Sequence, residues 1–344
     1  MTFTRRMRNV LLLAALLVTA LPALAQTDVA IGLEQFGTGN AFRPGDYCAI
    51  RLKLTSILAQ ATPVWVQWEV PNADGDVAEY GRTLTLTPGV PAFVWLYAPL
   101  APSVDTGTVW AVRVFEERDG VRRRELGGAR IDPRSSNAQK IDLERSAIGV
   151  IGSRHLGLGD YNVPGDRLNR PVGGHEDTRI IFGLSPAQLP DRWEGLKQYE
   201  AIAWAGDRDT PQDLSLDQAN ALMEYVFRGG HLIIVLPAAG NPWSLGTKGQ
   251  NLLEDLLPEA QPRNDVSVPL SDLLPVLSKS NSVRGSIETS IRVFKDLKSD
   301  FDATSHSTRW FDPLIALPDG RVVVITRSYG MGWVTLIGID LADG

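Results

Sequence analysis

The sequence predicts two modules of different class, an antiparallel β-sandwich followed by a mostly parallel α/β domain. Three observations carry this prediction. Between residues 26 and 133, short runs alternate apolar and polar residues and are separated by turns rich in Gly and Pro, a pattern typical of antiparallel strands. Between residues 146 and 344, continuous apolar runs flank a strongly amphipathic helix, as in parallel α/β sheets. Residues 134–145 are polar and without periodicity, which indicates a linker.

The first 25 residues have the pattern of a secretory signal peptide. Three arginines precede an apolar run from Val10, and Ala23-Leu24-Ala25 forms a small-residue cleavage site. The run is short for a membrane span and Pro22 interrupts it. We therefore expect cleavage after Ala25 and export to the periplasm or cell envelope. The alternative is an uncleaved membrane anchor.

Charge and cysteine content limit the classes of partner and of cross-link. The whole chain has a formal charge of −6, and the signal peptide contributes three arginines without an acid. The exported chain is therefore more negative still, which argues against nucleic acid or anionic lipid as the main partner. Cys48 is the only cysteine, so no disulfide can form within the chain. Stability must come from core burial, which a chain of this length can supply.

Five runs of the first module predict β-strands. In "YCAIRLKLT", Ile50, Leu52 and Leu54 share one face. The other runs are "PVWVQWEV", "RTLTLT", "AFVWLY" and "TVWAVRVFEE", which contain Trp65, Trp68, Trp95 and Trp110. Turn residues separate them in "RPGD", "NADGD", "TPGV" and "RDGV". We expect an immunoglobulin-like β-sandwich without a catalytic constellation.

The second module begins with a buried strand at Ala147–Ile151. Glycines follow it, but Asn and Pro residues then extend a loop where a dinucleotide-binding fold would open a helix, so we expect no cofactor. "LPDRWEGLKQYEAIAWAG" predicts a short helix around Trp193 and then a strand at 201–205.

A helix and a strand follow in "DLSLDQANALMEYVFRGGHLIIVLP". Together with the strand at 201–205 they form a strand–helix–strand unit. Ser215 and Gln218 form a capping box, and Gly229-Gly230 ends the helix. The strand His231–Leu236 comes next, so the unit predicts a right-handed parallel crossover. We further expect a helix at 248–257, irregular chain at 260–290 apart from Leu270–Leu277, and a terminal hairpin around Gly330 and Gly332.

Three stretches together resemble the class I glutamine amidotransferase-like superfold, including its trehalose-utilisation-like branch. They are "LPDRWEGLKQYEAIAW", "LSLDQANALMEYVFRGGHLIIVLP" and "SYGMGWVTLIGIDLAD", and the resemblance covers about residues 147–342. It implies a flavodoxin-like sheet. It also implies a catalytic cysteine after the strand 231–236, with a His-x-Glu further along the chain.

The catalytic residues that the resemblance implies are missing. Pro237, Ala238 and Ala239 stand where the cysteine would be, and no Glu follows two residues after His306. Methyl groups cannot replace a thiol nucleophile. "NPWSLG" also lacks the Gly-x-Ser-x-Gly elbow of serine hydrolases. We therefore expect that amidotransferase activity is absent.

Ligands of open α/β sheets lie beyond the carboxyl ends of the strands. This rule nominates three pairs of residues as ligand or partner contacts: Arg154 and His155, Asp207 and Asp209, and Asn241 and Trp243. Asp207 and Asp209 form either an acid–base pair or a solvated loop, and Trp243 is either a stacking platform or a packed cap. No metal site is expected, because the four histidines are widely separated and "NADGD" lacks the later Glu of an EF-hand.

These observations favour a non-catalytic envelope protein that acts as an interaction or ligand-sensing module. Its partner would be an envelope protein or a small ligand, and not nucleic acid. The alternative is a carboxylate-dependent hydrolase acting on a carbohydrate-like substrate, with Asp207 and Asp209 within about 5–10 Å of each other. Because the chain stops directly after an apolar run, we also expect that the native polypeptide continues past Gly344, into a membrane anchor.

Overall fold

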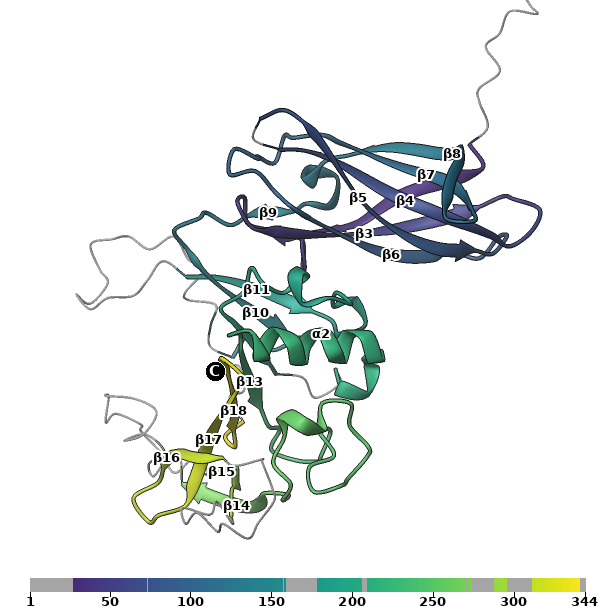
Figure 1. The fold of residues 1–344 in the computed structure, drawn as a ribbon. Coiled ribbons are helices and arrows are strands. Elements are labelled where there is room, and N and C mark those ends of the chain that lie inside the picture. Colours follow the sequence, from purple (N-terminus) through teal and green to yellow (C-terminus); the bar gives the residue numbers. More distant parts are fainter. Residues whose placement is uncertain are drawn as a thin grey trace, which may run out of the picture.

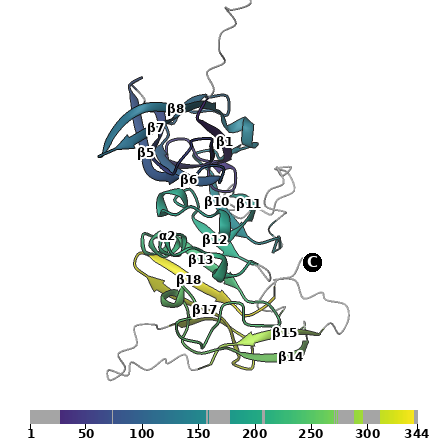
Figure 2. The same cartoon turned by 90° about the vertical axis from the view of Figure 1, so that its right-hand side faces the viewer.

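The computed structural model describes residues 27–72, 74–156, 158, 178–205, 209–269, 271, 273, 288–295 and 311–340. The predicted signal peptide and its cleavage site lie outside these residues. The chain is β-rich, and α2 (Leu216–Phe227) is the α-helix whose bounds lie within the described residues. The first module lies beside one end of the second, as both views show (Figures 1 and 2).

The first module is a β-sandwich of two antiparallel sheets, as predicted. One sheet has the order β1-β3-β6 and the other the order β5-β4-β7-β8. Their strands are β1 (Val29–Phe36), β3 (Tyr47–Ser56), β4 (Thr62–Pro71), β5 (Val77–Leu86), β6 (Ala92–Pro99), β7 (Trp110–Arg118) and β8 (Val121–Ile131). All neighbouring strands within these sheets pair antiparallel. The period-two pattern thus identified β3 to β7, whereas β1 and β8 were not among the five predicted runs.

Aromatic residues fill the centre of the sandwich. Phe36 stacks on Trp110, and Trp68 meets both rings edge-on, with ring centroids 5.0 to 6.1 Å apart. Trp95 is also buried, whereas Trp65 is half-buried beneath the guanidinium of Arg122. Three of the four strand tryptophans are therefore core residues and are not exposed for an interface.

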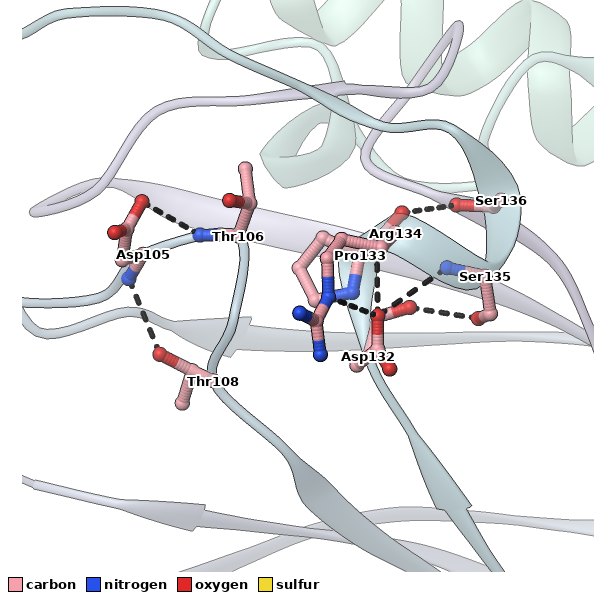
Figure 3. Close-up of polar contacts among 8 residues, drawn as sticks. All are labelled: Asp105, Thr106, Thr108, Asp132, Pro133, Arg134, Ser135 and Ser136. Atoms are coloured by element: carbon pink, nitrogen blue, oxygen red, sulfur yellow. Dashed lines mark hydrogen bonds and ion pairs between the residues drawn. The ribbon is translucent and has the colours of Figure 1, made fainter.

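The segment predicted to be a linker is ordered against the sandwich. Asp132 caps a 3-10 turn, η1 (Pro133–Ser136), by accepting hydrogen bonds from the amides of Arg134 and Ser135, next to the turn at Asp105–Thr108 (Figure 3). β9 (Gln139–Lys140) then pairs with β2 (Ala41–Phe42). Ile141 is buried, so the segment packs against its neighbours. The lack of periodicity reflects a turn and a two-residue strand.

A buried polar contact joins the two modules. The hydroxyl of Thr38, in the turn after β1, donates to the carbonyl of Gly195 over 2.6 Å. The carbonyl of Thr38 accepts hydrogen bonds from Gln198 and Tyr199. Thr38, Gln198 and Tyr199 are all at most 2% exposed. Because buried polar groups need partners, this network fixes one arrangement of the modules.

The second module is built on a mixed seven-stranded sheet with the order β11-β10-β12-β13-β18-β17-β16. The strands are β10 (Ser146–Ile151), β11 (Thr178–Leu184), β12 (Ala201–Trp204), β13 (His231–Val235), β16 (Asp312–Ala316), β17 (Val322–Tyr329) and β18 (Gly332–Ile337). The first five strands in this order run parallel, and β17 and β16 add antiparallel pairs. The sheet begins beside the sandwich and extends away from it (Figure 2).

Helix α2 connects β12 to the parallel strand β13, as the sequence predicts. Its capping box is present, with Ser215 accepting from the Gln218 amide and Gln218 accepting from the Ser215 amide. Gly229 continues the chain at a φ of 117°, which suits glycine. A doubly wound domain would carry helices on both faces of its sheet. Besides α2, the described residues include only Ser271 and Leu273 in α-helix. The structure thus confirms a β-rich chain with a mixed sheet and does not confirm a flavodoxin-like α/β domain.

The prediction of a helix at 248–257 is wrong. The segment consists of turns and one 3-10 turn, η6 (Glu254–Leu256). Gly249 has a φ of 73°, and the side chain of Asn251 binds the backbone of Trp243 and Leu253. These side-chain hydrogen bonds replace the helical ones. The helix expected around Trp193 is likewise a 3-10 turn, η4 (Trp193–Gly195).

Two strands lie in the region predicted to be irregular. β14 (Arg263–Pro269) pairs antiparallel with β15 (Glu288–Val293), at the end of the molecule away from the sandwich (Figures 1 and 2). Most of the expected Leu270–Leu277 element lies outside the described residues. β15 also contacts β18, because the amide of Arg292 donates to Gly338 over 2.6 Å. The small sheet is thereby held beside the carboxyl end of β18.

Candidate functional site

The chain following β13 forms an open hollow at the carboxyl edge of the parallel strands. Its lining consists of residues 237–242 and Asp340, and its volume is about 610 Å³. Pro237 is buried, whereas Ala239 and Gly240 are exposed. The turn that carries a nucleophile in many α/β enzymes thus presents methyl groups and backbone.

Asp340 closes one side of this hollow and is already paired. It forms an ion pair with Arg154, which follows β10, and its Oδ2 accepts a hydrogen bond of 3.1 Å from the Ala238 amide. The side chains of Arg154 and Asp340 are 23% and 13% exposed. Asp340 is therefore held by one ion pair and one backbone hydrogen bond. The contact ties the ends of β10, β13 and β18 together.

The two sequence-predicted residues after β10 have different surroundings. Arg154 reaches Asp340 at the hollow, as described above. His155 is exposed, and its ring lies 4.6 Å from the ring of Phe182. The structure therefore brings Arg154, and not His155, to the residues that line the hollow.

The two sequence-predicted residues after β13 serve the turn itself. Asn241 accepts from the Leu245 amide at 3.0 Å and donates to the Leu245 carbonyl at 2.9 Å. Trp243 is 1% exposed and meets Trp204 edge-on at 4.9 Å. Its ring cannot stack on a ligand in this arrangement. Of the two predicted roles, Trp243 therefore has that of a packed cap. Asn241 still lines the hollow.

The proposed carboxylate pair is only half described. Asp207 lies outside the described residues, so its separation from Asp209 is not defined. The main-chain carbonyl of Asp209 accepts a hydrogen bond of 2.8 Å from the indole of Trp204. This contact joins Asp209 to Trp204, whose ring packs against Trp243.

Arg292 is a residue that the sequence did not indicate. It belongs to β15, is 7% exposed, and donates from Nε to Pro237 O (3.2 Å) and from Nη2 to Gly240 O (2.7 Å). Burial lowers the pKa of its guanidinium. The available signal was a lone arginine inside the apolar run "SIRVF". Because irregular chain was predicted up to residue 290, the strand that carries Arg292 was not expected.

Two side chains of types that enzymes commonly use lie elsewhere, one buried and one half-buried. Cys48 is 1% exposed in the sandwich core, and burial raises the pKa of its thiol far above the usual range. His231, at the start of β13, lies at the opposite end of the strand from the hollow. Its Nε2 is 2.8 Å from Thr335 Oγ1, and burial lowers its pKa. Neither group faces the hollow. Among the described residues, no cluster of three metal-ligand side chains occurs.

The hollow has few chemical groups for a ligand to meet. The hollow offers backbone groups, two alanine methyls, an amide and an ion-paired carboxylate, with a buried arginine behind the turn. No serine, threonine or cysteine is among the residues that line it. Acyl transfer needs a nucleophile together with a base.

In the described part of the chain, no helix is both long and apolar enough to cross a membrane.

No protein-family model and no curated protein sequence matches the chain. Among solved structures, an exo-β-1,4-mannosidase from Opitutaceae bacterium strain TAV5 is similar at a TM-score of 0.28 and 15% identity, over 61% of this chain and 32% of that one. The DNA glycosylase AlkC of Pseudomonas fluorescens gives 0.21 and 16%, over 31% and 30% of the two chains. CsgH from R. palustris gives 0.20 and 12%, over 32% and 96%. The chain thus spans about a third of the length of the first two, and scores this low establish neither a shared fold nor a shared function.

Proposed function

We propose that this chain is an exported, non-catalytic binding protein of the cell envelope, and that its ligand occupies the hollow after β13. One observation carries the proposal: Arg292 holds two carbonyls of the turn at the nucleophile position, but the turn offers only Pro237, Ala238, Ala239 and Gly240. A site that keeps its shape without a reacting group can recognise a ligand and cannot attack it.

In this proposal the second module is a flavodoxin-like domain of the amidotransferase-like type. Numbered in chain order, the five parallel strands follow the spatial order 2-1-3-4-5, which is the order of flavodoxin-like sheets. This order supports descent of the second module from an amidotransferase-like domain that has lost its cysteine. It also supports the hollow as the ligand site, because ligands of such sheets lie beyond the carboxyl ends of the strands. An immunoglobulin-like sandwich would then present this domain.

Native mass spectrometry tests the proposal. The full chain, purified from the envelope of its own cells, is expected to carry a small ligand. Ala239→Glu places a charged side chain in the hollow and should abolish the ligand signal. Ala61→Glu is the matched control, because Ala61 is also exposed and lies in the loop between β3 and β4.

Two results would contradict the proposal. A ligand retained by Ala239→Glu would move the site away from the hollow. Turnover of glutamine amides or glycosides by the purified chain would show that it is an enzyme after all, and loss of that turnover in Ala239→Glu would place the chemistry in the hollow.

A further inference from the structure

A buried positive charge lies directly behind the turn that forms the hollow. The side chain of Arg292 comes from β15, and its Nε and Nη2 hold the carbonyls of Pro237 and Gly240. With 7% of its surface exposed, Arg292 is withdrawn from most of the solvent that would hydrate its charge. An arginine remains protonated at any physiological pH. The fold therefore maintains a permanent cation at this position.

Nothing negative among the described residues compensates this cation. Both acceptors are neutral carbonyls, and no described carboxylate lies within 4.0 Å of the guanidinium nitrogens. Asp340, on the rim of the hollow, is paired with Arg154. Buried charges in proteins are otherwise paired with opposite charges or with bound ions. An uncompensated guanidinium is therefore suited to an anion from outside the chain.

The geometry gives such an anion a place to bind. Arg292 lines a pocket of about 10 Å³, together with Gly240, Asn241 and Pro242. This is room for about one oxygen atom or one water molecule. The same three residues also line the large hollow, so the small pocket adjoins it. Nη1 donates to no described group and is not enclosed, which leaves it available to an acceptor.

We propose that the hollow binds a small ligand through an oxyanion, a carboxylate or phosphate group, one oxygen of which enters the small pocket and accepts hydrogen bonds from Arg292. Charge-assisted hydrogen bonds to a guanidinium are stronger than neutral ones and select for oxyanions. The remainder of the ligand occupies the hollow against the methyls of Ala238 and Ala239. This inference rests on the proposed function and names the chemistry of its ligand.

Titrations with inorganic phosphate and with acetate test the inference, at constant ionic strength set with chloride. The full chain carries ¹³C-methyl alanine, so the signals of Ala238 and Ala239 report on the hollow. Saturable shifts of these two methyls are expected with one or both anions, and which anion is the tighter identifies the group. Chloride alone at the same ionic strength is expected to leave them in place. Equal shifts with chloride would overturn the inference.

Variants of Arg292 assign the contact. Arg292→Gln is expected to weaken anion binding about tenfold or more, as the loss of a charge-assisted hydrogen bond predicts. Arg292→Lys keeps the charge without the fork and should bind with intermediate affinity. Ala61→Glu should bind like the wild type. Unchanged affinity in folded Arg292→Gln would overturn the inference. If Arg292→Gln does not fold, Ala239→Glu is the decisive variant. Unchanged anion affinity in Ala239→Glu would then overturn the inference.

The inference and the proposed function fail in different ways. If neutral ligands from an envelope extract shift the Ala238 and Ala239 methyls while phosphate and acetate do not, the role of Arg292 is wrong and the hollow remains a binding site. If nothing in the extract shifts these methyls while other methyls respond, the proposed function is wrong as well.

Discussion

Cys48 and His231 carry side chains that enzymes commonly use, but Cys48 is buried and His231 is half-buried at the end of β13 away from the hollow. A thiol reacts as the thiolate, and the raised pKa of Cys48 keeps the proton on sulfur. His231 is held against Thr335 within the sheet and is disfavoured as a cation. The opposite case is Arg292, whose charge cannot be removed by losing a proton. Arg292 therefore combines a permanent charge with a place in the lining of a pocket.

Cys48 is expected to be inert toward Ellman's reagent in the folded chain. Its 1% exposure and its raised pKa both oppose thiolate attack. In about 6 M guanidinium chloride one thiol per chain should react within minutes. Rapid reaction of the native protein would mean that the sandwich core opens around Cys48.

Replacing His231 with Gln should reduce the loss of stability on acidification. Burial lowers the pKa of folded His231 below its ordinary value of 6.5, so as pH falls the unfolded chain binds the proton first. The contribution of His231 is therefore intact above about pH 6.5 and is lost progressively below it. Urea unfolding between pH 7.5 and pH 5 measures this slope. His155→Gln, at an exposed ring, is the control, and an identical slope in His231→Gln and wild type would contradict the interpretation.

At the scale of elements, the contact between β15 and the end of β18 positions Arg292. Gly338 lies against β15 so closely that a Cβ atom would be 2.1 Å from the Arg292 carbonyl oxygen. The backbone must therefore shift if any side chain is introduced there. The turn after β13 depends on the same contact, because Arg292 binds its carbonyls.

Gly338→Ala is expected to destabilise the chain by about 1–3 kcal/mol, the usual cost of overpacking, and to weaken anion binding. Thermal unfolding and the phosphate titration measure the two effects. Gly107→Ala is the matched control, because nothing lies within 4 Å of its added Cβ. Normal stability and affinity in Gly338→Ala would show that β15 is not fixed by β18.

Local patterns predicted the elements that local interactions determine. The capping box at Ser215 and Gln218 and the glycines after α2 define that helix without tertiary help, and the alternation in "YCAIRLKLT" defines β3. The segment 248–257 has helical composition, but the Asn251 side chain binds the Trp243 carbonyl, a contact that no local pattern reveals. Arg292 was missed for the same reason, since its partners lie more than 50 residues earlier in the chain.

At the scale of the whole molecule, the two modules are joined by buried hydrogen bonds and not by a free linker. Tyr97 of β6 donates to Asp191, which is also paired with Arg82 of β5. Thr38 and Tyr199 form a second contact, with a hydrogen bond of 2.6 Å. The interface places the sandwich at the end of the sheet away from β14 and β15 (Figure 2). The hollow is therefore formed without any lining residue from the sandwich.

We expect the wild-type chain to unfold in a single calorimetric transition, because breaking the Thr38 contact exposes buried polar groups. Tyr199→Phe removes one buried donor, which should cost about 1 kcal/mol and lower the cooperativity between the modules. Tyr47→Phe, at an exposed ring, should unfold like the wild type. Two separate transitions in the wild type would show that the modules are independent.

The central claim is that the hollow after β13 binds a ligand and does not catalyse. The most direct measurement is a ¹³C-methyl alanine spectrum of the full chain, recorded with and without the small-molecule fraction of its own cell envelope. The account predicts that the Ala238 and Ala239 methyls shift and the Ala61 methyl does not, with the ligand recovered chemically unchanged. Unmoved Ala238 and Ala239 signals, or a ligand converted to product, would contradict it.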